Sequence, residues 1–163
     1  MINGTAIKPR LTRAGVARIV TVVLSLVVTA TVFFVAAGTI DISRAWVYYG
    51  GLLVYLVLAM VFIVVVFPTA IETINARGKL NKGVKTWDKV FGLTYTALML
   101  IQPAVAGWDV GRVHSFEPPL LVFVLAFAVT ILANAIVHWA MIVNRHAETG
   151  VRIQEDRHHD RVK

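Results

Sequence analysis

Four long stretches without a charged side chain dominate the pattern of hydrophobic and polar positions in this chain. They contain 22, 27, 19 and 27 residues and lie between Arg18 and Asp41, Arg44 and Glu72, Lys89 and Asp109, and Glu117 and Arg145. Val, Leu, Ile, Ala and Phe make up most of each stretch. A helix needs about 20 mostly apolar residues to cross the hydrocarbon core of a bilayer. The pattern therefore predicts four transmembrane helices, near residues 17–38, 46–67, 87–107 and 119–143.

The composition supports a membrane protein and excludes an ordinary soluble domain. The 163 residues are 58% hydrophobic, with a mean hydropathy of +0.74, whereas soluble domains are typically about 45–50% apolar. Strands of a membrane barrel would instead show alternating segments of about 10 residues. We expect an all-α integral membrane bundle of four transmembrane helices in residues 1–143, followed by a tail of residues 144–163.

The basic residues predict how the helices are oriented in the membrane. Of the 16 Lys and Arg residues, 14 fall in residues 1–18, 69–89 and 144–163. Short segments rich in Lys and Arg stay in the cytoplasm, so both termini and the 69–89 loop are predicted to be cytoplasmic. Attraction to anionic lipid head groups is a secondary role for this charge. The basic tail lacks aromatic residues on which bases could stack, so no nucleic-acid partner is expected.

Several kinds of chemistry find no support in the sequence. The chain has no cysteine, which excludes disulfides and thiolate metal sites. Its histidines at 146, 158 and 159 match no standard zinc spacing, so no metal site is predicted. No phosphate-binding glycine loop, nucleophilic serine motif or His-Glu-x-x-His element is present. The apolar run after the basic N-terminus exceeds the 7–15 residues typical of a signal peptide, which favours an uncleaved first span.

Two stripes of polar residues occur inside the predicted spans. One consists of Thr21, Ser25 and Thr29, and the other of Thr130, Asn134 and His138. Residues four apart share a helix face. The first stripe predicts packing against another helix through small residues. The second stripe is open to two interpretations: hydrogen bonding between packed helices, which we favour, or a ligand or proton site.

The tail carries the most specific motif of the chain. It contains Asn144, the run Val151-Arg152-Ile153-Gln154-Glu155-Asp156-Arg157, and His159. This pattern resembles bacterial members of the isoprenylcysteine carboxyl methyltransferase family. Further similar segments are residues 37–41, 44–46, 86–90 and 107–112, together with Glu72 and Arg77-Gly78. The resemblance thus covers about residues 36–162, and several of the matching positions are polar.

The resemblance implies a cofactor and a cellular location. The family consists of membrane enzymes that transfer a methyl group from S-adenosylmethionine, in the better-known members to a C-terminal prenylcysteine carboxylate. By resemblance, Gln154 faces the cofactor at the cytoplasmic surface, while His159 and Val162 belong to a stretch that cradles it through backbone groups. The expected location is the inner (plasma) membrane of a bacterium. The chain departs from the family at His158, where Gly is usual, and at His146-Ala147, where Phe-Phe is common.

The family's later motifs define what activity to expect. Its members continue with Gly-x-Tyr, Arg-His-Pro-x-Tyr, further spans and a Glu-Glu pair, which hold most of the cofactor and the reacting carboxylate. This sequence stops at Lys163, before all of them. Because electrostatic preorganisation is usually the largest catalytic term, we expect the amino-terminal portion of such an enzyme, inactive alone, with a second chain as a partner. No catalytic residue and no methyl acceptor is assigned.

Two other functions were weighed against the methyltransferase. The main alternative is a non-enzymatic four-helix scaffold or interaction subunit, whose partners are the lipid bilayer and other membrane helices. A transporter or channel subunit is less favoured, because the predicted spans carry no charge and a substrate pathway usually needs some.

Overall fold

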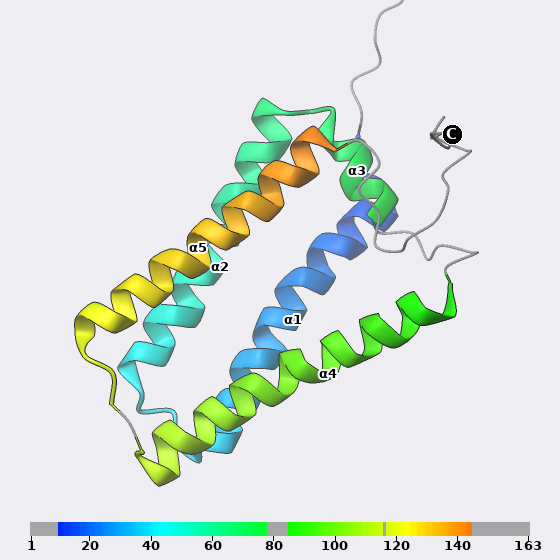
Figure 1. The fold of residues 1–163 in the computed structure, drawn as a ribbon. Coiled ribbons are helices and arrows are strands. Elements are labelled where there is room, and N and C mark those ends of the chain that lie inside the picture. Colours follow the sequence, from blue (N-terminus) through cyan, green and yellow to red (C-terminus); the bar gives the residue numbers. More distant parts are fainter. Residues whose placement is uncertain (1–9, 78–84, 116, 145–163) are drawn as a thin grey trace, which may run out of the picture.

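The computed structural model describes residues 10–77, 85–115 and 117–144, and this part of the chain contains helices and no strand. It has four long α-helices and one short one, arranged as Figure 1 shows. In chain order the elements are α1 (Arg13–Ala37), α2 (Ser43–Val66), α3 (Ala70–Arg77), α4 (Thr86–Trp108), the π-helical turn η1 (Asp109–Val113) and α5 (Leu120–Val143). The prediction of an all-α fold is confirmed.

The four long helices also confirm the four predicted spans. Each is long and apolar enough to cross a membrane, with α4 and η1 counting as one helix of 28 residues. A helix of 24 residues is about 36 Å long, against a hydrocarbon core of about 30 Å. Many large apolar side chains of these helices are exposed; Val65 and Leu93, for example, are each 73% exposed. Soluble proteins rarely expose continuous apolar surfaces of this kind. The protein is an integral membrane protein whose apolar surface contacts lipid.

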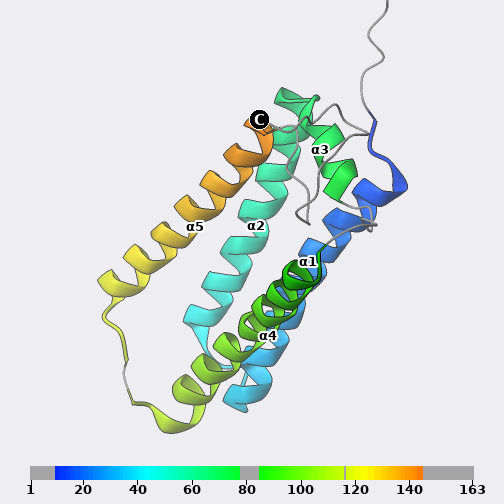
Figure 2. The same ribbon diagram turned by 45° about the vertical axis from the view of Figure 1, so that its right-hand side comes forward.

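The long helices form two parallel pairs. α4 packs on α1 and α5 packs on α2, and the members of each pair run in the same direction (Figure 1). Figure 2 shows α5 and α2 side by side again after a turn of the molecule. We call the end where α1 begins, α2 ends and α3 lies the α3 end. The other end, with residues 38–42 and 109–119, is the opposite end.

Local sequence signals explain where the helices begin and end. Thr12 caps α1, because its side-chain oxygen accepts a hydrogen bond from the Gly15 N–H. Gly38 ends α1 in the left-handed conformation with φ of 72° and donates its N–H to the carbonyls of Phe34 and Val35, which glycine does without steric cost. α2 ends just before Pro68, as expected for a residue that cannot continue a helix.

The short helix α3 was not predicted. It occupies the first part of the 69–89 segment, which the sequence indicated only as a polar connection. Five of its eight residues are buried: Ala70, Ile71, Thr73, Ile74 and Ala76. Ile74 is 1% exposed and packs in the core of the molecule with Ile63 of α2. Two helical turns are too short for hydrophobic periodicity to separate from a loop, so only the fold reveals this element.

The first polar stripe packs against another helix only at Thr29, which is partly buried and whose carbonyl accepts from the Tyr49 hydroxyl of α2 at 3.4 Å. Thr21 and Ser25 are exposed, and their hydroxyls donate to carbonyls of their own helix, at Ala17 and Val22. Thr29 bonds within α1 in the same way. A Ser or Thr hydroxyl in a membrane helix can donate a hydrogen bond to a backbone carbonyl of the preceding turn. These three hydroxyls therefore need no hydrogen-bond partner on another helix.

Candidate functional site

The three predicted cofactor residues, Gln154, His159 and Val162, lie outside the described residues. The last described residue is Asn144, which follows α5 at the α3 end. α5 also contacts α3 there. Asn144 therefore lies at the same end as the short helix, and the candidate site is built from the described groups at this end.

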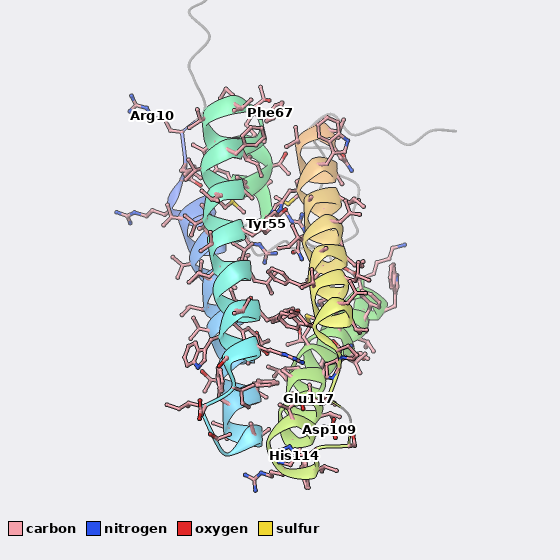
Figure 3. All side chains as sticks on the ribbon, turned by 90° about the vertical axis from the view of Figure 1, so that its left-hand side faces the viewer. Arg10, Tyr55, Phe67, Asp109, His114 and Glu117 are labelled. Carbon is pink, nitrogen blue, oxygen red and sulfur yellow. The ribbon has the colours of Figure 1, made fainter. Side chains whose placement is uncertain are left out.

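A hydrogen bond between the partly buried Tyr55 and the buried His138 joins α2 and α5. The Tyr55 hydroxyl lies 2.9 Å from Nδ1 of His138, and His138 is 9% exposed. Figure 3 shows Tyr55 on the side of α2 that faces α5. Lipid offers no partner to a polar group, so this pair satisfies two side chains that would otherwise be costly.

The second polar stripe thus divides into two parts. The Thr130 hydroxyl donates to the Ala126 carbonyl and the Asn134 amide donates to the Thr130 carbonyl, both within α5. Only His138 bonds across helices. The favoured interpretation, hydrogen bonding between packed helices, therefore describes His138, while the other two side chains are satisfied locally.

Arg77 places a guanidinium in the same part of the molecule. It is the last residue of α3, is partly buried, and has its Nε atom fully buried. Burial lowers the pKa of Arg77, and the positive charge of Arg18 on α1 lowers it further. Arg77 in turn acts electrostatically on His138. Two positive charges, of Arg18 on α1 and Arg77 on α3, thus act on each other at the α3 end.

Asn75 fixes α3, and with it Arg77, to the start of α1. Its side-chain oxygen accepts from the backbone N–H and the hydroxyl of Thr12, at 2.9 and 3.0 Å, and its amide donates to the Arg10 carbonyl at 2.9 Å. Gly15 makes room for this contact, because a Cβ there would lie 2.2 Å from the Asn75 oxygen. The position of Arg77 is thus set by a defined anchor rather than by a free loop.

At the opposite end, the residues that carry the family resemblance hold helices together. Gly107 and Gly111 lie against α1 so closely that a Cβ would be 2.2 Å from the Phe33 carbonyl oxygen and 2.3 Å from that of Ala37. Glycines four residues apart allow membrane helices to approach at backbone distance. The contact explains why two glycines occur here at that spacing.

Two arginines and a tryptophan complete this end. Arg112 donates to the Ala36 carbonyl at 2.9 Å, Arg44 donates to the Pro118 carbonyl at 2.5 Å, and Trp46 donates to the Ile40 carbonyl at 2.8 Å. A cation near a helix C-terminus is favourable, and Arg112 has that position relative to α1. Arg112 thus satisfies a carbonyl that the last turn of α1 leaves open, while Arg44 and Trp46 satisfy carbonyls of the connections before α5 and α2.

A groove between α1 and α2 is an apolar surface rather than a polar site. Its volume is about 880 Å³, and its walls include Phe34, Trp46, Tyr49 and Leu53 without any charged side chain. Within the described ranges, no group of three His, Cys, Asp or Glu residues could hold a metal ion.

Comparison with known proteins adds no relative. No protein-family model, no curated protein and no solved structure matches the chain. The polar groups at the α3 end are therefore interpreted from their own geometry. The sequence analysis did not single out Tyr55 or Arg18 as site residues, although a tyrosine three turns inside an apolar helix is a signal that could have found the first.

Proposed function

We propose that this chain is the membrane domain of an S-adenosylmethionine-dependent methyltransferase similar to the isoprenylcysteine carboxyl methyltransferase family. The observation that carries the proposal is the resemblance over about residues 36–162, with its most specific part after Asn144. The fold is compatible with it, since α5 and Asn144, which precede that segment in the chain, end at the α3 end of the bundle.

The α3 end faces the cytoplasm in this proposal. Of the described basic residues, Arg10, Arg13, Arg18, Arg77, Lys85 and Lys89 belong to it, whereas Arg44 and Arg112 belong to the opposite end. Lys and Arg in short segments mark the cytoplasmic side. The membrane is then the inner membrane of a bacterium, as in the family members that the chain resembles.

Three residues of the tail would hold the cofactor. Gln154 would contact it by a side chain, and His159 and Val162 through the backbone. When bound, S-adenosylmethionine supplies an electrophilic methyl group on a sulfonium centre. The described residues contribute the support for this segment: α3 is tied to α1 by Asn75 and contacts α5 just before the tail begins.

The test is binding of radiolabelled S-adenosylmethionine to the purified full chain in detergent, by equilibrium dialysis. We expect saturable binding with a Kd below roughly 1 mM, which corresponds to about −4 kcal/mol. Gln154→Ala should weaken the binding at least about tenfold, since each factor of ten is about 1.4 kcal/mol. The matched control is Gln102→Ala, the same change within α4. Absence of saturable binding, or equal loss in both variants, would overturn the proposal.

A non-enzymatic scaffold is the second candidate, and one observation favours it. The matching residues at the opposite end, including Gly107, Gly111 and Arg112, all serve helix packing, so a protein that keeps only the fold would retain them. A scaffold predicts no cofactor binding in the dialysis experiment together with an unchanged unfolding midpoint when S-adenosylmethionine is added.

A further inference from the structure

Gln102 places a polar amide on the lipid-facing surface of α4. The charged residues that bound this span in the sequence are Lys89 and Asp109. At 1.5 Å per residue, Gln102 lies about 20 Å from the first and about 10 Å from the second along the helix, which is within the hydrocarbon core. Its side chain is exposed and makes no hydrogen bond to any described residue.

This exposed amide differs from the polar side chains of α5. Thr130 and Asn134 each donate to a carbonyl of their own helix, so lipid has no unpaired group to accommodate there. Pro103 adds a second polar demand beside Gln102, since it has no N–H with which to bond the Met99 carbonyl. Lipid chains offer no hydrogen bond, and an unpaired amide in apolar surroundings is costly. Gln102 therefore requires a polar partner from outside the described chain.

Gln102 belongs to a regular stripe of exposed residues on α4. Its members follow one another at spacings of four, three, four and three residues, which is the pattern of helices that pack side by side along a seam. Its aromatic and aliphatic members are between 52% and 64% exposed, so no described helix covers them. We call this stripe the α4 seam; it consists of Phe91, Tyr95, Leu98, Gln102 and Val105.

The α4 seam points away from the helix on which α4 packs. Gly107 marks the side of α4 that faces α1, because a Cβ there would lie 2.2 Å from the Phe33 carbonyl oxygen. At about 100° per residue, Gln102 is turned by about 140° from Gly107. In Figure 1, α4 lies at the edge of the bundle beside α1. A second molecule can therefore reach the seam without displacing a helix.

We propose that the α4 seam is the interface through which two copies of this chain associate in the membrane. The distribution of basic residues gives all copies the same orientation, so their α4 helices run parallel. A twofold axis along the membrane normal then brings the same residues of both copies together. A carboxamide both donates and accepts hydrogen bonds, so the two Gln102 side chains satisfy each other.

This self-complementarity selects a second copy as the occupant of the seam. An acyl chain would cover the apolar members but would leave the amide unpaired. A polar residue at one position of such a seam also fixes the register of the paired helices. The seam shares no residue with the tail or with the α3 end, so this inference does not rest on the proposed function.

Cysteine cross-linking tests the arrangement, because the chain has no cysteine of its own. Leu98→Cys puts a thiol on the seam. Leu93→Cys is the matched control: the same change in the same helix, at a side chain that is 73% exposed and is turned by about 140° from Leu98. A disulfide requires Cα atoms within about 7 Å. In liposomes at a low protein-to-lipid ratio, mild oxidation should give roughly fivefold more covalent dimer with Leu98→Cys than with Leu93→Cys.

Gln102→Leu tests the pair of amides. Energy transfer between donor-labelled and acceptor-labelled copies of the full chain, measured in liposomes as lipid is added, gives the dissociation constant of the dimer. Loss of the reciprocal hydrogen bonds should weaken association about tenfold, and Gln102→Asn should keep part of the affinity. Thr96→Val is the control, because the Thr96 hydroxyl bonds to the Gly92 carbonyl of its own helix; it should leave the affinity unchanged.

Three results would overturn the proposal: a chain that stays monomeric at every dilution, equal cross-linking at positions 93 and 98, or equal affinities of Gln102→Leu and Thr96→Val. The first would mean that lipid or a different protein covers the seam. Cofactor binding is a separate matter: variants at Gln102 should lose the dimer and keep S-adenosylmethionine binding, whereas Gln154→Ala should do the reverse. Failure of one proposal can thus be distinguished from failure of the other.

Discussion

The two ends of the bundle hold their helices together by different means. At the opposite end, the backbone at Gly107 and Gly111 lies directly on the carbonyls of Phe33 and Ala37, and Arg112 and Arg44 add hydrogen bonds to main-chain carbonyls. At the α3 end, side chains make the connections, through Asn75 to the start of α1 and through Tyr55 to His138. The glycine contacts leave no space for another atom. The side-chain contacts place a polar group, His138, in the interior, where it can bind a ligand as well as stabilise the fold.

The largest effect is expected from Gly107→Ala at the opposite end. The new Cβ would lie 2.2 Å from the Phe33 carbonyl oxygen, and backbone cannot rotate away as a side chain can. We expect a loss of about 3 kcal/mol or more in the free energy of unfolding, at the upper end of what overpacking costs. The measurement is unfolding of the purified protein in mixed detergent micelles as the denaturing fraction is raised.

Gly92→Ala is the control for that substitution. Gly92 lies in the same helix, and no atom is within 4 Å of the Cβ position. Replacing a helical glycine with alanine is favourable by up to about 1 kcal/mol, so its stability should be unchanged or slightly raised. Equal destabilisation of both variants would show that glycine acts through helix flexibility and that the close approach of α4 to α1 is not what matters.

A smaller effect is expected from Asn75→Ala at the α3 end. The variant loses the hydrogen bonds to Thr12 and Arg10, of which each is worth about 0.5–1.5 kcal/mol net. Because the group is partly solvated, we expect about 1–2 kcal/mol of destabilisation and faster proteolysis near residue 77. Arg112→Gln is the counterpart at the opposite end; it loses one bond, to Ala36, and should cost under about 1 kcal/mol. The reverse order would contradict our description of the two ends.

The smallest effect concerns the bond between Tyr55 and His138. A double-mutant cycle with Tyr55→Phe and His138→Leu should give a coupling energy of about 1 kcal/mol, within the range measured for hydrogen bonds between membrane helices. The control cycle pairs Tyr55→Phe with Thr130→Ala, whose hydroxyl bonds within its own helix, and should give a coupling near zero. Similar values in the two cycles would mean that the pair contributes no specific interaction.

The four membrane spans were predictable because each depends on the length of a charge-free apolar stretch, which can be counted along the sequence. Long charge-free stretches require helices in lipid, and Pro68 marks the end of α2 as expected. α3 was not predicted, because no pattern that can be counted along the sequence marks it. Its eight residues mix buried Ile71 and Ile74 with exposed Glu72, and their burial depends on three helices that the sequence does not place.

The site could be predicted only in part, since its groups come from distant positions. His138 stood out as a polar residue inside a span, but its partner Tyr55 is 83 residues away. Arg18 and Arg77 were read as markers of orientation, a role that does not depend on what they face. The glycines at 107 and 111 were noted within a matching segment, whereas their contact with α1 is a property of the fold alone.

The position of α4 depends on a single neighbouring helix, α1. Among the described residues, α4 touches no helix other than α1 and its own continuation η1, and its first fifteen residues are nearly all exposed. Gly107, where α4 approaches α1 most closely, is far from the start of α4: at 1.5 Å per residue, Thr86 lies about 32 Å away. A tilt of α4 by roughly 10° about Gly107 would therefore move Thr86 by about 5 Å. The place of the start of α4 relative to α1 is thus sensitive to packing at the other end of the helix.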